Sequence, residues 1–373
     1  MNVSRSSCDE EENNTIIKVT ETKCLKVVDN TGHNHYSFRE ALVHKLCSVS
    51  KFLPTTISVS IKGEQLTIEM EKLEKKLKNP TDENKITAWK SILQAVAVLN
   101  HFKIAHRDIK NGNIMYRNGV DAVLIDFGLS KTLYDGYHTP EVASEFFRAP
   151  ELDKELELQK YSFEIDSWGL GIWAIDMWNK NLKNMHKFHI CWNIKYNFVE
   201  YDISTDEERD ITLMFHNINL KALGRPSVKQ VPSKEDFLQV NEERYALYFK
   251  NIPKKILKMV ESFLLPAAQR KTACDYVKID SSRCLYTYPE EFQCPVPADW
   301  AECVEFYKAI YWSMKEYFKD EKDLVPLASL GCCYLLSTSL HPEDLCSDFN
   351  VDFDKMNMRF LEWFLQWSIL KKK

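Results

Sequence analysis

One stretch of the chain, HRDIKNGNIM at positions 106–115, constrains its fold and chemistry more than any other segment. It places Asp108, Lys110 and Asn113 at short intervals, and the apolar run AVLI then leads into the tripeptide DFG, which starts at Asp126. Oxygen atoms of Asn113 and Asp126 suit Mg²⁺, which also takes phosphate oxygens as ligands. Asp108 can orient a hydroxyl and accept its proton, and Lys110 offers a positive charge to a phosphoryl group. The stretch therefore predicts a site that handles magnesium and phosphate.

Composition places the chain among ordinary globular proteins. Its 373 residues are 45% hydrophobic and 28% charged, and they predict two or three packing units. A net charge of −5 gives no reason to expect nucleic acid as a partner. None of the eleven cysteines lies in a C-x-x-C pair, so we expect free thiols in a reducing compartment and an intracellular location, cytoplasmic or nuclear. The polar, acidic residues 1–14 are expected to form a disordered leader.

The most apolar segment is LVPLASLGCCYLLSTSL at 324–340. It contains Pro326 and several hydroxyl side chains, and it falls short of the roughly 20 apolar residues that a spanning helix needs. The pattern favours a buried helix, and we expect no membrane partner.

The order of patterns predicts an α+β fold. Residues 15–78 show short β-type apolar clusters, a helix within HYSFREALVHKL that carries Phe38, Leu42, Val43 and Leu46 on one face, and a hairpin around Lys62–Gly63. From about residue 86 onward long amphipathic helices dominate. A small β-rich unit followed by a larger helical unit leaves a cleft, where ligands preferentially bind.

Five motifs in fixed order carry a family resemblance. HRDIKNGN, DFG, APE at 149–151, DSWGLG at 166–171, and QRKTACD resemble the motifs of protein kinases. The resemblance implies a two-lobed kinase domain at 15–290, with an N-lobe at 15–73 and a C-lobe at 74–290, and with ATP and Mg²⁺ in the cleft. Asp108 and Lys110 would be catalytic and Asn113 and Asp126 would bind metal. Structural roles fall to three further residues: Asp166, Glu151 and its partner Arg270.

The lysine two residues after Asp108 is similar to that of serine/threonine kinases, which implies protein substrates with serine or threonine hydroxyls. In the N-lobe the resemblance implies that Lys26 holds ATP phosphates and pairs with Glu40, with Lys23 as the competing lysine. Backbone groups of Glu71 and Leu73 would bind adenine at the hinge. One departure is clear: no glycine precedes Gly32, so the glycine-rich phosphate loop of the family is missing.

The segment YHTPEVASEFFRAPE resembles that of cyclin-dependent kinases. Thr139 falls at the phosphorylated position and Ser144 at the position that contacts the catalytic loop. Arg39 and Arg107 match two arginines that would bind the phosphate. Lys131 replaces the third, and lysine lacks the bidentate fork of arginine. The alternative for Thr139 is an exposed loop hydroxyl.

Residues 291–373 contain three apolar-faced helical patterns beyond the kinase resemblance. Two interpretations stay open: a helical extension that packs on the large lobe, or part of a cyclin box that binds the Arg39–Glu40 helix in cis. The latter would imply cyclin-like regulation in cis or in trans. For the whole chain, the alternatives to a kinase are a pseudokinase scaffold and a cyclin-like binding module on a weak kinase. The short N-lobe and unusual tail also resemble divergent kinases of large DNA viruses, which would place the protein in a host cell.

Overall fold

Four antiparallel strands form the sheet of the N-terminal unit. They are β1 (Thr15–Val19), β2 (Lys23–Asp29), β3 (Thr56–Lys62) and β4 (Gln65–Glu71), in the spatial order β1-β2-β4-β3. The computed structural model of the chain describes residues 15–29, 39–44, 50–62, 65–132, 137–138, 143, 147–152, 159–179, 185–196, 204–279, 291–298, 304–319, 321–336 and 342–366. The predicted leader at 1–14 and residues Phe38, Leu46 and Gly63 lie outside these ranges.

Alternation of side chains fixes the register of this sheet. On β4 the side chains of Leu66, Ile68 and Met70 are buried, whereas the residues between them are more exposed. Lys26 lies opposite Ile68 on the neighbouring strand β2. Residues 39–44 are helical and buried, as the apolar spacing predicts. The strands on either side of the predicted hairpin pair as expected, from Lys62 opposite Gln65 upward.

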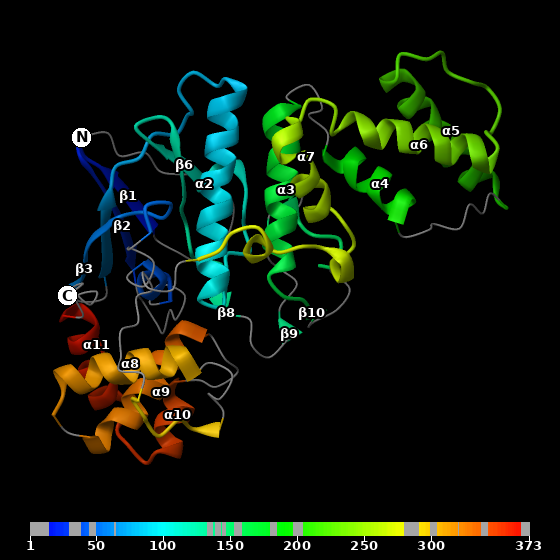
Figure 1. Ribbon diagram of the computed structural model, residues 1–373. Coiled ribbons are helices and arrows are strands. Elements are labelled where there is room, and N and C mark those ends of the chain that lie inside the picture. The colour runs from blue at the N-terminus through cyan, green and yellow to red at the C-terminus, as the bar shows by residue number, and fades with distance from the viewer. Residues whose placement is uncertain are drawn as a thin grey trace.

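The larger unit is built on a long central helix, α2 (Asp82–His101) (Figure 1). Thr81 caps it by accepting a hydrogen bond from the Asn84 N–H. The other helices of this unit are α3 (Glu164–Trp178), α4 (Met185–Tyr196), α5 (Asp206–Ala222), α6 (Lys234–Leu247) and α7 (Lys254–Phe263). Its short strands are β5 (Ile104–Ala105), β6 (Ile114–Arg117), β7 (Asp121–Leu124), β8 (Lys131–Thr132), β9 (Tyr137–His138) and β10 (Gln159–Lys160).

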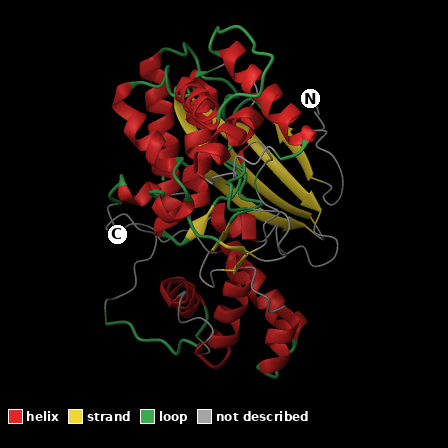
Figure 2. Ribbon diagram, turned by 90° about the vertical axis from the view of Figure 1, so that its right-hand side faces the viewer, coloured by secondary structure: helices red, strands yellow, loops and turns green. Residues whose placement is uncertain are grey.

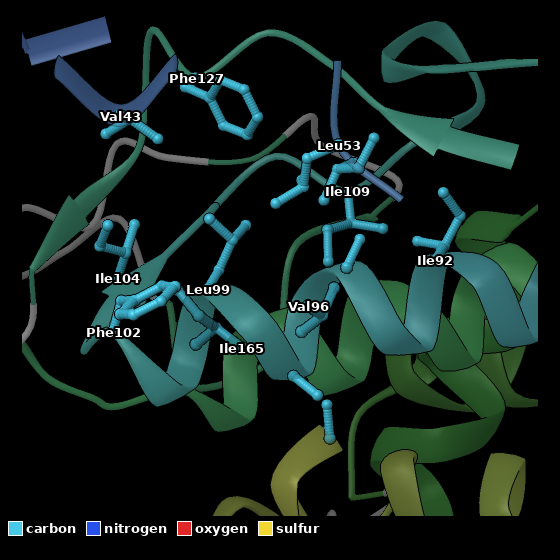
Figure 3. Packing of buried hydrophobic residues seen from close by; sticks show 14 of the residues in the cluster. Val43, Leu53, Ile92, Val96, Leu99, Phe102, Ile104, Ile109, Phe127 and Ile165 are labelled. Atoms are coloured by element: carbon cyan, nitrogen blue, oxygen red, sulfur yellow. The ribbon is translucent and has the colours of Figure 1, made fainter. Parts of the chain in front are cut away.

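The hydrophobic core lies on both sides of α2. Ile92, Val96 and Leu99 project from the helix toward Ile109 and Leu53, which lie above them in Figure 3. The Trp89 indole N–H of the same helix donates to the Leu170 carbonyl of α3 at 3.2 Å. Ile109 directly follows Asp108. The packing of Ile109 against α2 therefore fixes how far the 106–115 segment lies from the helix.

Four helices follow near the C-terminus: α8 (Val304–Tyr317), α9 (Leu324–Leu336), α10 (Pro342–Asp348) and α11 (Phe353–Gln366). They form the group at the bottom of Figures 1 and 2. Leu327, Ala328 and Leu330 of α9 are fully buried, as predicted for a buried helix. Helix α10 begins at a proline. Pro342 is its first residue, where a missing N–H costs no helical hydrogen bond.

This C-terminal group contacts both other parts of the chain. Helix α11 lies against β3 of the sheet, and α9 lies against β8. Buried side chains of all three parts, among them Val59, Ile109 and Phe360, belong to one hydrophobic cluster. The group therefore reaches the N-terminal sheet as well as the segment after DFG. Within the described ranges, no helix combines the length and the apolar character that a membrane crossing needs.

Candidate active site

A buried carboxylate holds the central loop in place. Asp166, in the first turn of α3, accepts hydrogen bonds from the backbone N–H groups of His106 at 2.7 Å and Arg107 at 2.8 Å. Arg107 has a φ of 67°, in the left-handed region that non-glycine residues rarely adopt. Burial raises the pKa of Asp166, while the charge on Arg107 and the two N–H groups act in the opposite direction. The acid of the DSWGLG motif therefore holds a strained loop.

Two further features of α3 position this loop. A Cβ atom at Gly169 would lie 2.9 Å from the Ile109 Cβ, so the helix approaches the loop closely only because glycine stands there. Asn111 accepts a hydrogen bond from the Trp173 indole N–H at 2.7 Å and donates one to Asp176. Asn111 is thus a structural residue, and Asn113 is the asparagine of the 106–115 segment that can act in the site.

Asp108 lies at the centre of a hydrogen-bond network. Its carboxylate is 2.8 Å from Lys110 Nζ and accepts a hydrogen bond from Asn113 Nδ2, also at 2.8 Å. Asn113 Nδ2 donates in addition to the Asp108 carbonyl at 2.9 Å. The Asp108 N–H donates to His106 Nδ1, so Nε2 of that ring carries the proton and donates to the Ile125 carbonyl at 3.0 Å. Three of the predicted site residues are therefore brought together.

A second cluster joins the sheet to the DFG tripeptide. Lys26 Nζ lies 2.7 Å from Glu40 Oε1 and 3.2 Å from Asp126 Oδ1. Burial disfavours the Lys26 ammonium ion, but the two carboxylates outweigh this effect and raise the pKa of Lys26. Burial likewise works against the charge of Asp126, yet Lys26 lowers the pKa of that carboxyl. Lys23, the competing lysine, pairs with Glu69 at 2.6 Å instead.

The donor set suits a magnesium ion. Asn113 uses its Nδ2 toward Asp108, which turns its amide oxygen to the other side. Asp126 keeps a charged carboxylate whose side chain is 46% exposed, so one face of it is open to a ligand. One amide oxygen and one carboxylate leave room for the water and phosphate oxygens that Mg²⁺ prefers.

Residues 5–262 of the chain match the family model described as "Protein kinase domain". The chain belongs to the protein kinase family. The matched segment is well over half of the 373 residues, and the predicted two-lobed kinase fold is confirmed. The sheet with residues 39–44 forms the N-lobe, and α2–α7 form most of the C-lobe (Figure 1).

Curated relatives of this kinase include proteins named as serine/threonine, mitogen-activated and CTD kinases. Serine/threonine-protein kinase dst1 of Dictyostelium discoideum is 38% identical over 87 residues, which is 23% of this chain and 11% of that protein. Mitogen-activated protein kinase mpkC of Aspergillus fumigatus is 31% identical over 108 residues, 28% of each chain. CTD kinase subunit alpha of Saccharomyces cerevisiae is 33% identical over 93 residues, 25% of this chain and 17% of that one.

A solved structure, that of the yeast RNA Pol II CTD kinase CTDK-1 complex, aligns with a TM-score of 0.45 and 18% identity. The alignment covers 75% of this chain and 97% of the other. The kinase described here spans under a third of the length of each of the three curated relatives named above.

The hinge carries a residue that the sequence did not single out. Arg117 of β6 donates to the Glu71 carboxylate, through Nε at 2.8 Å and also through Nη2. Glu71 accepts a further hydrogen bond from the Thr55 N–H at 2.9 Å, and its own N–H donates to the Thr55 carbonyl. The side chain of Glu71 therefore joins the two lobes. Adenine binding by backbone groups of Glu71 and of the buried Leu73 stays a prediction.

The two predicted phosphate-binding arginines lie beside the start of the activation segment. Arg39 Nη2 donates to the Gly128 carbonyl at 2.9 Å, and Arg107 Nε donates to the Leu129 carbonyl at 2.7 Å. Lys131 lies in the short strand β8 and is half-buried. The predicted sites Thr139 and Ser144 lie outside the described residues.

Glu151 and Arg270 form the predicted structural pair. Arg270 Nη2 lies 3.0 Å from Glu151 Oε2, and its guanidinium stacks over the Trp168 ring. The Arg270 side chain has no exposed surface. The pair therefore anchors the end of the activation segment on the C-lobe core.

Replacing Arg270 by alanine should destabilise the kinase strongly, because the change removes a fully buried guanidinium and leaves the part-buried Glu151 carboxylate without its partner. Breaking such a pair costs about 3–5 kcal/mol. Arg225→Ala is the matched control, since Arg225 pairs with Glu243 at the surface and such pairs contribute about 0–1 kcal/mol. Urea unfolding of the two variants and the wild type measures the difference. Equal losses in both variants would contradict the structural role of Arg270.

Proposed function

We propose that the protein is an ATP-dependent protein serine/threonine kinase, which transfers the γ-phosphate of ATP to serine and threonine hydroxyls of protein substrates. The observation that carries the proposal is the network of Asp108, Lys110 and Asn113, which one buried carboxylate holds in place. The relatives that are named serine/threonine-protein kinases support the choice of hydroxyl.

The residues divide the work of phosphoryl transfer. Asp108 orients the substrate hydroxyl and takes its proton as the oxygen bonds to the γ-phosphorus and the bond to the bridging oxygen of ADP breaks. Lys110 neutralises charge on the transferred group. Lys26, held by Glu40, positions the α- and β-phosphates. Bound magnesium, with Asn113 and Asp126 as protein ligands, would neutralise the phosphate charge. The chemistry is mainly positioning and charge stabilisation.

A pseudokinase scaffold is the competing function. The missing glycine-rich loop is compatible with it, but a scaffold has no use for Asp108 held within reach of Lys110, or for Asp126 held within reach of Lys26. A kinase without that loop would rely on Lys26, the hinge and magnesium to hold the nucleotide. We infer an intracellular site of action, cytoplasmic or nuclear, from the free cysteines.

We further infer that residues 291–373 regulate the kinase in cis, in the manner of a cyclin-like partner. Support comes from the contacts of α11 with β3 and of α9 with β8, because β8 directly follows the DFG segment. Buried side chains of the sheet, of the larger helical unit and of the C-terminal helices belong to one hydrophobic cluster, so the C-terminal helices pack as part of the kinase.

Phosphate transfer is the direct test of the function. Wild-type protein with Mg·ATP should label serine- and threonine-containing peptides, and Asp108→Asn should lower the rate by about 10²–10⁴-fold, because the proton acceptor is lost. Asp126→Asn should also lose activity. Asp121→Asn, at an exposed position on β7, is the control and should keep it. A wild-type protein that binds no nucleotide and transfers no phosphate would establish the scaffold instead.

Nucleotide binding distinguishes the two lysines of β2. Lys26→Met should weaken binding of Mg·ATP and abolish most transfer, because Glu40 and Asp126 lose their shared cation. Lys23→Met removes an equal charge from the same strand but only breaks the surface pair with Glu69. Fluorescence titration with a labelled ATP analogue compares the variants. Stronger loss in Lys23→Met would reverse the assignment.

A substitution in the interior of the C-terminal helices tests whether these helices regulate the kinase. Gly331→Leu forces a side chain into Phe360, whose ring lies 2.9 Å from the position of the added Cβ, and should lower phosphate transfer. Coupling between two sites typically changes a binding affinity by about 5–150-fold. Met358→Ala, at a side chain that is 67% exposed on α11, is the control. Full activity in Gly331→Leu, and in a folded protein that lacks residues 295–373, would exclude regulation in cis.

A further inference from the structure

The outer face of helix α5 carries an apolar stripe that the proposed mechanism does not use. Ile211 is 54% exposed and Met214 is 57% exposed, although both side chains are large and apolar. Ile218, one turn further along, is half-buried. The three residues follow one another at spacings of three and four, so they lie along one side of the helix. Contiguous exposed apolar surface often marks a site of protein–protein contact.

Packing within the C-lobe turns this face of α5 outward. On the other side of the helix, the rings of Phe215 and His216 lie 6.4 Å and 6.2 Å from the Phe237 ring of α6. A capping box that starts at Thr205 fixes the first turn of α5. In Figure 1 this helix lies at the end of the C-lobe that is far from the sheet and from the C-terminal helices. The stripe is therefore an outward-facing surface at a distance from the candidate active site.

A neighbouring loop widens the stripe. Asn217 Nδ2 donates to the Val228 carbonyl at 2.9 Å, and the Val228 N–H donates to Asn217 Oδ1 at 2.8 Å. These two hydrogen bonds fix the backbone of Val228 beside α5, and the Val228 side chain is 40% exposed. The apolar surface is thus built by two segments that are fixed to each other.

The two ends of the stripe carry opposite charges. Glu207 lies one turn before Ile211, Lys221 lies one turn after Ile218, and both charged residues are exposed. From Glu207 to Lys221 the stripe advances by four, three, four and three residues. An average repeat of 3.5 residues is the pattern that lets two helices pack along a common seam.

This order of side chains is complementary to its own reverse. If two copies of α5 lie antiparallel with their Met214 side chains opposite each other, Glu207 of each copy faces Lys221 of the other copy. Ile211 then faces Ile218. A parallel arrangement would instead place Glu207 beside Glu207 and Lys221 beside Lys221. A two-fold contact between identical chains requires a surface of this self-complementary kind.

We propose that the protein forms a two-fold dimer through antiparallel pairing of α5, with a second copy of this chain as the partner. The apolar centre of the stripe supplies the buried part of the contact, and the Glu207–Lys221 pairs at both ends set its direction and register. One pair of helices is smaller than the interfaces of permanent dimers, so we expect association in the micromolar range. Because α5 lies far from the sheet, the pairing leaves both active sites accessible (Figure 1).

Sedimentation equilibrium of the full-length protein across the micromolar range tests the dimer. The wild type should associate, and Met214→Lys should abolish association, because it places two ammonium groups opposite each other at the two-fold axis. Met358→Lys is the matched control, since Met358 is a 67% exposed methionine on α11, and it should associate like the wild type. Circular dichroism verifies that each variant is folded.

Charge exchange at the ends of the stripe tests the antiparallel register. Glu207→Lys should raise the Kd of the dimer about tenfold to hundredfold, because both end pairs become like-charged at once. Lys221→Glu should have the same effect. The double variant Glu207→Lys/Lys221→Glu restores opposite charges at both ends and should return the Kd to the wild-type value.

Three results would overturn the proposal. A wild type that stays monomeric shows that a second copy does not cover the stripe, whether another protein binds there or none. A dimer that persists in Met214→Lys forms through a different surface. Single charge variants that associate as tightly as the wild type, or a double variant that stays as weak as the single ones, exclude the antiparallel pairing of Glu207 with Lys221.

Discussion

The ion pair between Lys26 and Glu40 is the contact on which the site depends, because it joins three separate pieces of chain. Lys26 comes from β2, Glu40 from the following helix, and Asp126, the second partner of Lys26, from the loop after β7. Burying two charges costs free energy that their attraction only partly returns, so such a pair is weak evidence of stability. Its value here is geometric: an ammonium group is fixed beside the carboxylate of Asp126, which is predicted to bind metal.

In the C-lobe, a second buried carboxylate also fixes the geometry of the site. Asp166 uses its carboxylate to bind two consecutive backbone N–H groups and thereby holds Arg107 in a left-handed conformation. Asp126 shows the same combination of a left-handed φ and support from buried neighbours. Strain of about 1–3 kcal/mol at such residues must be offset by the surrounding structure. The two strained positions flank the place where phosphate is expected, which makes the rigid core beneath them part of the catalytic apparatus.

Sequence reasoning succeeded where chemistry and spacing are local. Asp108, Lys110 and Asn113 lie within six residues, so their grouping follows from a single loop, and the alternation along β4 predicts its buried face. It could not find contacts made between distant segments. Arg117 binds Glu71 from 46 positions away, and Asn111 is fixed by α3, yet neither sequence position differs visibly from a surface polar residue. The contacts of His44 with Thr56 and Phe127 were hidden for the same reason, because the helical spacing of His44 is that of any residue one turn after Glu40.

The C-terminal helices make further contacts with segments that are distant in sequence. β3 contacts α11, and the same strand carries Thr56, which holds His44 beside Phe127. The C-terminal helices, the sheet and the DFG tripeptide are thus successive neighbours in one packed body. Packed interiors are stiff and deform little, so a displacement of α11 would first displace β3. Adjacency alone does not establish energetic coupling, which requires an element with two arrangements. The helix at 39–44 is the candidate for that element, because a single hydroxyl on β3 binds His44 and a single lysine on β2 binds Glu40.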